Sequence, residues 1–304
     1  MPERPDLEYV VPRLADALAG AVITATRVRK PVVLRLAVEG KPEELWTGRR
    51  FGAVSRRAHF VLFALAGGAP DVEMVVAPML AGRFTVDDAG ERSPGDLAVA
   101  WTLSDGRELR YRDSEQMGKV YLLPRGRWDQ VPGLQHVGVD VLDAQRFTRE
   151  AFRTLARTRR DQVRVFIMDK SALDSLGNAY ADEVLWHARI HPKTMARALS
   201  DDELDALHGS IVHVLSDARD EVARRQAPLD EKVRDFLKVR NRHGEPCPRC
   251  GTTLRCAGVH GHDTFFCPQC QPETRRSSIV DWRKAPSTPG PAAPPGVRQK
   301  RSRR

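Results

Sequence analysis

The chain has 304 residues, of which 41% are hydrophobic and 29% are charged, so it is long enough for two domains that each bury a core. It contains no apolar run long enough to cross a bilayer and no charged-then-apolar leader, which argues against a membrane or secreted protein and predicts a cytoplasmic one. The formal net charge is +9, but residues 272–304 hold nine Lys/Arg and two Asp/Glu, so charge alone argues only weakly for a nucleic-acid partner.

The chain opens with "MPERPDLE", which places a proline directly after the initiator methionine. Removal of Met1 would make Pro2 a free secondary amine, and an α-amino group titrates at ~8 whereas a lysine titrates at ~10.4. Such an amine is a nucleophile near neutral pH. The alternative is that Pro-Glu only opens a helix, since the fixed φ of proline suits the first turn. On these residues alone the helix alternative is favoured.

Apolar residues over 7–18 recur at helical spacing, and Pro12 must either kink that helix or delay its start. From about 22 to 125 the pattern changes to short β-rich runs such as "VVLRLAV", "HFVLFAL" and "VEMVVAPML", separated by Gly, Pro and Asp turns. These runs predict a β-sandwich or flattened barrel. After "VPGLQHVGVD" the period is helical again, over 147–160, 179–190 and 201–224, so the second domain is predicted to be all-α.

The segment "MDKSALDSLGNAYADEVLWHARIHP" combines a turn with a helix start. We expect Gly177 to adopt the left-handed conformation and Asn178 to occupy the N-cap of the following helix. Exposed amides and an asparagine side chain at a helix start can hold a phosphate. An ordinary asparagine cap is the alternative. The run "RTLARTRRDQVR" at 153–164 is a second candidate for backbone contacts, or a solvated helix face.

All five cysteines lie between residues 247 and 270, as "CPRC" and "CPQC" plus one more. Two Cys-x-x-Cys pairs can place four thiolates around a tetrahedral Zn²⁺, whereas a redox pair would need two. The predicted ligands are Cys247, Cys250, Cys267 and Cys270. Because four thiolates fill the coordination shell, the zinc is predicted to be structural, and Cys256 is predicted to take no part.

The ordered set "MPERPDLE", "LGNAYADE" and "GEPCPRCG…TFFCPQCQ" resembles the formamidopyrimidine-DNA glycosylase and endonuclease VIII family, of which this chain would be a divergent member. The resemblance covers about residues 2–271. It implies an α+β protein: an N-terminal β-sandwich with a leading helix, an all-α helix–two-turns–helix domain and a C-terminal zinc β-hairpin. The expected boundaries are 1–130 for the catalytic domain, 131–243 for the DNA-binding domain, 244–272 for the hairpin and 273–304 for a disordered Pro-rich basic tail.

The resemblance also implies residue roles. In the family the N-terminal proline attacks the anomeric carbon of the damaged nucleotide and forms a Schiff base, so Pro2 is the expected nucleophile and Glu3 the general acid/base. The damaged nucleotide is flipped out of the duplex, and a methionine helps to fill the gap. Met79 is the candidate for that position, with a place in the sandwich core as the alternative. Asn178 matches the phosphate-contacting asparagine of the family.

Three motifs depart from the family pattern. His59 in "RRAHF" stands where a lysine usually contacts the lesion-side phosphate, and as a histidine it is expected to titrate near ~6.5. In "SEQMG", Gln116 and Met117 stand in place of an arginine and a phenylalanine. His262 in "HGHDTFF" replaces the arginine of the zinc hairpin. These substitutions weaken three cationic contacts to DNA.

Arg4 and Asp6 also replace an apolar residue and a glutamate. The nucleophile and its acid remain, so the sequence predicts a monomeric bifunctional DNA glycosylase/AP lyase that acts on double-stranded DNA containing a damaged base or an abasic site. In a bacterium it would associate with the nucleoid. The alternative is a lesion- or abasic-site-binding protein with weak or lost turnover. A zinc-ribbon transcription or RNA-binding factor is a more distant alternative, because it gives no reason for the N-terminal Pro-Glu.

Overall fold

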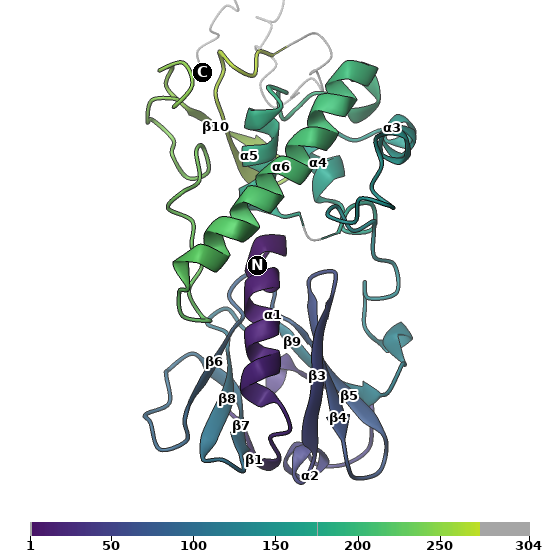
Figure 1. Ribbon diagram of the computed structural model, residues 1–304, viewed down its shortest axis with the longest axis vertical. Helices are drawn as coiled ribbons and strands as arrows, with labels where there is room; N and C mark the ends of the chain where they lie inside the picture. The colour runs from purple at the N-terminus through teal and green to yellow at the C-terminus, as the bar shows by residue number, and fades with distance from the viewer. Residues whose placement is uncertain (1, 175, 274–304) are drawn as a thin grey trace, which may run out of the picture.

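The structure is a computed structural model that describes residues 2–174 and 176–273. Its β-rich half and its helical half lie end to end, and the first helix begins at their junction and runs into the β-rich half (Figure 1). The predicted tail from residue 274 onward lies outside the described residues. In the part of the chain described, no helix is both long enough and apolar enough to cross a membrane.

Helix α1 spans Arg4–Leu18 and begins with a reciprocal cap, in which the Glu3 amide donates to the Asp6 carboxylate at 2.7 Å. Its apolar stripe is buried, and Leu14 and Leu18 are fully inaccessible to solvent. The helix runs through Pro12, which cannot donate a backbone hydrogen bond. The prediction of a helix is confirmed, but a start delayed by Pro12 is wrong.

Two sheets form the N-terminal sandwich. The larger has the order β2-β9-β5-β4-β3 and the smaller the order β1-β7-β8-β6, and only the β2–β9 pair is parallel among these neighbours. The strands are β1 Ile23–Val28, β2 Leu34–Leu36, β3 Arg50–Arg57, β4 Phe60–Ala66, β5 Val72–Ala77, β6 Arg83–Asp88, β7 Leu97–Leu103, β8 Arg107–Arg112 and β9 Lys119–Pro124. Short helices lie at Pro31–Val33 (η1) and Pro42–Trp46 (α2). The predicted sandwich is confirmed.

Apolar side chains of both sheets and of α1 fill one core. Trp46 and Trp101 meet edge to face with ring centroids 5.8 Å apart, and neither is exposed. Each of these large rings removes ~150–250 Å² from water, so the pair contributes strongly to the stability of the domain. Because α1 shares this core, the sandwich determines where the N-terminal residues lie.

The helical half contains α3 Arg149–Thr158, α4 Val163–Met168, α5 Asn178–His187 and α6 Asp201–Arg225, with short turns at Trp128–Gln130 (η2) and Ala196–Ala198 (η3). Helix α6 begins with a capping box between Ser200 and Glu203. The three predicted helices are present, whereas α4 was not predicted. Helix α6 crosses the molecule and packs against both α1 and α5 (Figure 1).

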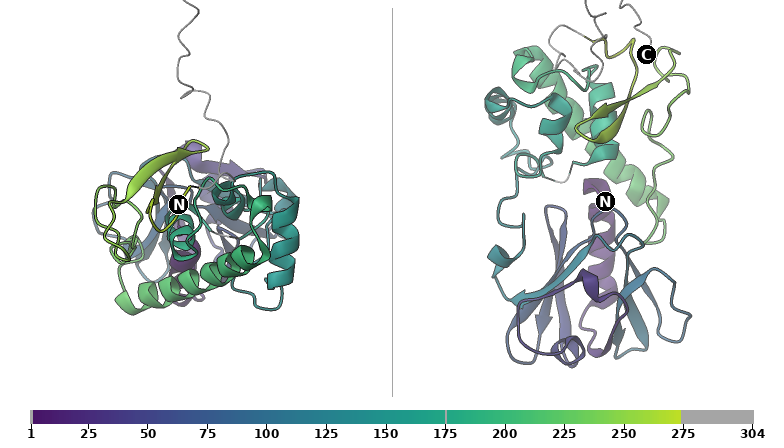
Figure 2. Two further views of the ribbon diagram at one scale, coloured as in Figure 1. Left: turned by 90° about the horizontal axis from the view of Figure 1, so that it is seen from above. Right: turned by 180° about the vertical axis from the view of Figure 1, so that it is seen from behind.

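The C-terminal unit is a hairpin of β10 Arg255–Val259 and β11 His262–Phe266, seen best from behind (Figure 2). The two turn residues, His260 and Gly261, both have positive φ, as a tight hairpin turn requires. The hairpin packs on α5. The predicted zinc hairpin is therefore part of the fold.

Charged side chains tie α1 and β3 to the helical half. Arg4 donates to Asp140 at 2.6 Å, and Arg56 donates to Asp174 at 2.6 Å and to Asp140 at 3.2 Å. Arg4, Arg56 and Asp174 are largely buried, so breaking one pair would leave a charge without its partner in a poorly solvated place. Arg4 thus helps to hold the two halves in register.

Candidate active site and metal centre

The Glu3 side chain caps helix α5, although the two are far apart in the sequence. Its carboxylate accepts hydrogen bonds from the backbone amides of Gly177 at 3.0 Å, Ala179 at 3.0 Å and Tyr180 at 3.2 Å. A carboxylate at a helix N-terminus satisfies free amides and interacts favourably with the helix dipole. Two helix starts, those of α1 and α5, therefore meet at one buried glutamate.

Gly177 leaves room for that carboxylate. A Cβ on Gly177 would lie 2.6 Å from Glu3 Cδ, well inside van der Waals contact. Gly177 has extended backbone angles, φ −119° and ψ −165°, so the expected left-handed conformation is wrong. Gly177 is itself the N-cap, and Asn178 is the first residue of the helix instead of its cap. Close approach, not an unusual φ, explains the glycine.

Burial raises the pKa of Glu3 above its ordinary value, and the charge of Arg234 and the amide hydrogen bonds of Ala179 and Tyr180 oppose this effect. Arg234 reaches the same region by donating to Asp6 at 2.7 Å and to the Tyr180 hydroxyl at 3.2 Å. A carboxylic acid with a raised pKa holds its proton closer to neutral pH. Glu3 is therefore suited to donate a proton and take it back.

A cavity of about 860 Å³ lies between the two halves, with Glu3 in its wall. It is lined by four predicted site residues: Glu3, Met79, Asn178 and His262. Pro2 lines a small adjoining pocket of about 20 Å³ together with Asp6 and Lys232. His59 and Gln116 do not line the large cavity. The fold thus brings together residues from the N-terminus, a β-turn, α5 and the hairpin.

His59 is mostly buried in the β3–β4 turn, with its ring packed on Phe60 at a centroid distance of 4.1 Å. Burial, with a smaller effect from the charge of Lys170, lowers the pKa of His59 to about 3. The expectation that this ring titrates near pH 6.5 is wrong, because a buried imidazolium loses its hydration. His59 is neutral at physiological pH.

Lys170 was not predicted as a site residue. It lines the large cavity, and its charge interacts with Glu3 and Asp174, while burial lowers its pKa. In the sequence it is one lysine in "MDKSALD", and nothing there indicates that it faces the N-terminus. Lys170 therefore adds a basic side chain to the cavity wall.

Two loops present apolar side chains at the cavity. Strand β5 ends at Ala77, and in the turn that follows, the Leu80 side chain is 52% exposed whereas Met79 is half-buried. Met117 in the second loop is 44% exposed, and both Leu80 and Met117 line the cavity. Single exposed apolar residues are common, but two that gather at one cavity are typical of an interaction surface. Leu80 was not predicted as a site residue, because the sequence alone does not distinguish it from its apolar neighbour Met79.

Asp113 builds the second loop. Its carboxylate accepts from the amides of Glu115 at 3.1 Å, Gln116 at 3.0 Å and Gly118 at 2.7 Å. Gln116 takes the left-handed conformation with φ 56°, and its side chain is exposed. This turn places Met117 in the wall of the cavity, whereas Gln116 does not line it.

Three arginines of the basic run at 153–164 are paired with carboxylates within the protein. Arg153 donates to Asp205 at 2.7 Å, Arg157 to Asp201 at 2.6 Å, and Arg159 to Asp161 at 3.0 Å. These arginines hold α3 against the start of α6 and against the α3–α4 turn. They do not form an uncompensated stripe, so the alternative of a structural helix face is favoured over DNA-backbone contacts.

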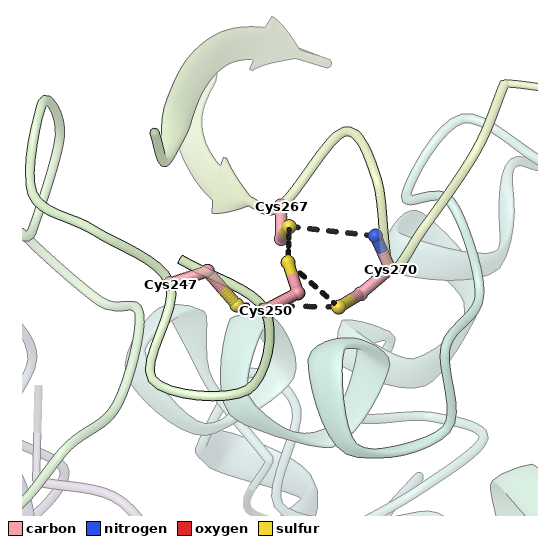
Figure 3. A group of neighbouring side chains, drawn as sticks. All are labelled: Cys247, Cys250, Cys267 and Cys270. Atoms are coloured by element: carbon pink, nitrogen blue, oxygen red, sulfur yellow. Dashed lines mark hydrogen bonds between the residues drawn. The ribbon is translucent and has the colours of Figure 1, made fainter. Parts of the chain in front are cut away.

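Four cysteine sulfurs converge beside the hairpin, as Figure 3 shows. Cys250 Sγ lies 3.5 Å from both Cys267 Sγ and Cys270 Sγ, and Cys247 Sγ lies 4.0 Å from Cys270 Sγ. A tetrahedron with Zn–S bonds of ~2.3 Å has edges of about 3.8 Å, so these residues fit one Zn²⁺. They form a structural zinc site. Cys256 is exposed on β10 and lies outside the group, as predicted.

The zinc site is docked on the C-terminal end of α5. Trp186 donates its indole N–H to Cys247 Sγ at 3.4 Å, and Arg249 stacks on the Trp186 ring at 4.1 Å. Gln271 accepts from the Cys267 amide and donates to the Ile190 carbonyl, both at 2.9 Å. Glu3 and Asn178 therefore lie at the N-terminal end of α5, and the metal centre lies at its C-terminal end.

Comparison with known proteins agrees with this geometry. Family models match residues 1–120 as a formamidopyrimidine-DNA glycosylase N-terminal domain and residues 137–225 as a formamidopyrimidine-DNA glycosylase H2TH domain. Residues 244–272 match the zinc finger found in FPG and IleRS. The chain belongs to the formamidopyrimidine-DNA glycosylase family. The predicted fold class and the predicted zinc are confirmed by these matches.

Individual relatives cover almost the whole glycosylase chain. A formamidopyrimidine-DNA glycosylase of Desulforamulus reducens is 31% identical over 278 residues, which is 89% of this chain and 99% of the relative. One of Symbiobacterium thermophilum is 32% identical over 98% of this chain and 99% of its own. Among solved structures, Thermus thermophilus MutM (Fpg) is similar at a TM-score of 0.77 and 29% identity, covering 90% of this chain and 100% of its own.

A Lactococcus lactis Fpg in complex with abasic-site DNA has the same fold, at a TM-score of 0.80 and 23% identity, covering 90% of this chain and 100% of its own.

Proposed function

We propose that this glycosylase excises damaged bases from double-stranded DNA and nicks the strand at the resulting abasic site. The observation that carries the proposal is the Glu3 carboxylate, which follows Pro2 directly and caps α5 beside Asn178 in the wall of the large cavity. Membership of the glycosylase family supports the reaction class.

Pro2 is the proposed nucleophile, provided that Met1 is removed. The lone pair of its nitrogen forms a bond to C1′ of the nucleotide as the bond from C1′ to the base breaks, and Glu3 supplies the proton that the departing base or the opening sugar takes up. The nitrogen then loses its proton, the bond from C1′ to the ring oxygen breaks, and a cationic iminium forms between the nitrogen and C1′. The iminium makes the protons on C2′ acidic, so removal of one of them eliminates the 3′ phosphate. The raised pKa of Glu3 supports its role as proton donor.

Asn178, His262 and Lys170 are the proposed contacts to the DNA backbone near the lesion. All three line the cavity, whose wall also contains Lys232, Arg234, Arg240 and Arg242. Cationic side chains around an anionic strand supply most of the sequence-independent affinity. Lys170 takes the part that was expected of His59, whose neutral buried ring is poorly suited to bind a phosphate.

Leu80 and Met117 are the proposed wedge that fills the space left by the flipped nucleotide. Leu80 replaces the expected Met79, and Met117, at the position of the family phenylalanine, is proposed in preference to Gln116. Their exposure and their shared position at the cavity support this assignment. Flipping costs a few kcal/mol of stacking and pairing, which inserted apolar side chains partly offset.

The domain boundaries 1–130, 131–243, 244–272 and 273–304, a monomeric state, and a cytoplasmic, nucleoid-associated location remain proposals. Residues 226–243 contain several of the basic side chains that line the cavity. The backbone amides of Lys238 and Val239 also donate to the Glu183 carboxylate, each at 2.8 Å. This arrangement supports its inclusion in the DNA-binding part.

The test is a panel of duplexes, each with one damaged base or an abasic site, incubated with the purified protein and resolved by strand size. Excision followed by nicking at one or more lesions is expected. Selective tight binding to a lesion with neither excision nor nicking would instead favour the non-catalytic alternative. Equal binding to damaged and undamaged duplexes, without excision or nicking, would contradict both.

A further inference from the structure

The Asn178 carboxamide has a fixed orientation in the structure. Its Oδ1 accepts a hydrogen bond from Arg164 Nη2 at 3.1 Å. A guanidinium has donors and no acceptor, so the flipped amide would set N–H against N–H at this contact. The oxygen of Asn178 must therefore face Arg164, which leaves the NH₂ group free to face the cavity that Asn178 lines. An NH₂ group in this position favours an anionic ligand, whose oxygens accept hydrogen bonds.

The Arg164 side chain is buried and makes hydrogen bonds to Asp182 and Asp263 in addition to Asn178. Its side chain is 1% exposed, its Nε donates to Asp182 Oδ1 at 3.0 Å, and its Nη2 also donates to the Asp263 carbonyl at 3.1 Å. Asp182 is fully buried and accepts in addition from Thr264 at 2.6 Å. Charge-assisted hydrogen bonds of this kind are strong in a poorly solvated interior. Arg164 therefore has little freedom to move.

The same contacts connect Asn178 with the zinc hairpin. Asp263 and Thr264 belong to β11, and Arg240 bridges the two parts by donating to Asp182 at 2.8 Å and to the Asp263 carbonyl at 3.0 Å. The Asp182 carboxylate thus accepts from both arginines, and Arg240 also lines the cavity. The spare donor of Asn178, in a cavity wall that also contains Arg240, favours a phosphate.

We propose that Arg164 is a positioning residue that holds Asn178 as a hydrogen-bond donor to a DNA phosphate and fixes that donor relative to the zinc hairpin. This inference rests on the proposed phosphate contact of Asn178. Arg164 makes no contact with DNA in this arrangement, and it acts only through the amide that it orients. Lysine keeps the charge but is a poor replacement, because its three donors share one nitrogen and lack the planar fork that reaches from Asp182 to Asn178.

The test is a double-mutant cycle of Arg164→Lys and Asn178→Ala, with equilibrium affinity for a duplex containing a reduced abasic site as the measurement. Each single variant should bind about 10-fold more weakly, or ~1.4 kcal/mol. In the Asn178→Ala background, Arg164→Lys should have no further effect, because the amide through which it acts is gone. Additive losses would overturn the inference, since they would indicate a general structural role.

Three controls make the outcome interpretable. Arg157→Lys, in the same basic run but paired with Asp201, should leave the affinity unchanged. Asn178→Asp keeps the shape and the partner Arg164 but turns a second acceptor toward the phosphate, so it should bind more weakly than Asn178→Ala. Zinc content and thermal unfolding show whether Arg164→Lys is folded. If the wild-type protein does not prefer the abasic duplex, the proposed function fails; if it does and the cycle is additive, only the role of Arg164 fails.

Discussion

Replacement of Gly177 by alanine should disable the active site without altering any residue that contacts DNA. The new Cβ would lie 2.6 Å from Glu3 Cδ and 2.9 Å from Glu3 Oε1. Ordinary carbon contacts are ~3.5–4.0 Å, so the carboxylate must move by about 1 Å. The three hydrogen bonds that the carboxylate accepts from backbone amides are 3.0–3.2 Å long, and a shift of this size would break or weaken them.

The magnitude follows from that shift. Misplacement of a catalytic group by about 1 Å can cost ~100-fold in rate, so we expect Gly177→Ala to slow single-turnover base excision by about that factor. Binding to a reduced abasic duplex should change much less, because Asn178 keeps its partner Arg164. The φ of −119° at Gly177 is accessible to alanine, so backbone strain does not contribute.

Gly209→Ala is the matched control. Gly209 lies within α6, and a Cβ there would meet no atom within 4 Å. That change should leave the excision rate unaltered and raise the free energy of unfolding by up to ~1 kcal/mol, because alanine is the better helix former. Excision by Gly177→Ala at the wild-type rate would refute the assignment of Glu3 to catalysis from its capping position.

Three further predictions concern the wedge, the buried histidine and the metal. Leu80→Ala and Met117→Ala should each lower excision about 10-fold and reduce the fluorescence rise of a base analogue at the flipped position; an unchanged rise would contradict the wedge. The pKa of His59 is about 3 in the folded protein and ~6.5 when unfolded, so its contribution to stability is present above pH ~6.5 and is lost as the pH falls toward 3. His59→Phe should therefore flatten the loss of stability in urea unfolding between pH 7 and pH 4, and the wild-type slope would contradict its burial. Cys267→Ser should release zinc, measured by elemental analysis, and weaken DNA binding severalfold; full retention of zinc would contradict the ligand set.

Features encoded by short-range spacing could be predicted from the sequence. The two Cys-x-x-Cys pairs indicated the zinc site, because ligand spacing alone brings the thiolates of each pair together. The helix over 201–224 was predicted within one residue, since apolar spacing and polar caps mark both of its ends.

Long-range packing could not be predicted. The carboxylate of Glu3 caps a helix whose N-cap residue, Gly177, lies 174 residues later, and the absence of a Cβ at Gly177 has meaning only when that carboxylate is in place. The pKa of His59 depends on burial and on Lys170, which belongs to the other half of the molecule. The choice between Met79 and Leu80 depends on where β5 ends, and boundaries of elements are the least predictable part of a sequence.

The central claim is that the nitrogen of Pro2 forms the covalent intermediate. The most direct measurement is borohydride reduction during reaction with an abasic-site duplex, followed by proteolysis and mass spectrometry of the peptide that carries the sugar. The account predicts an adduct on the N-terminal peptide beginning at Pro2, and no adduct when one residue is added before it. An adduct on Lys170, the cavity lysine whose charge interacts with Glu3 and whose pKa is lowered by burial, would contradict the account.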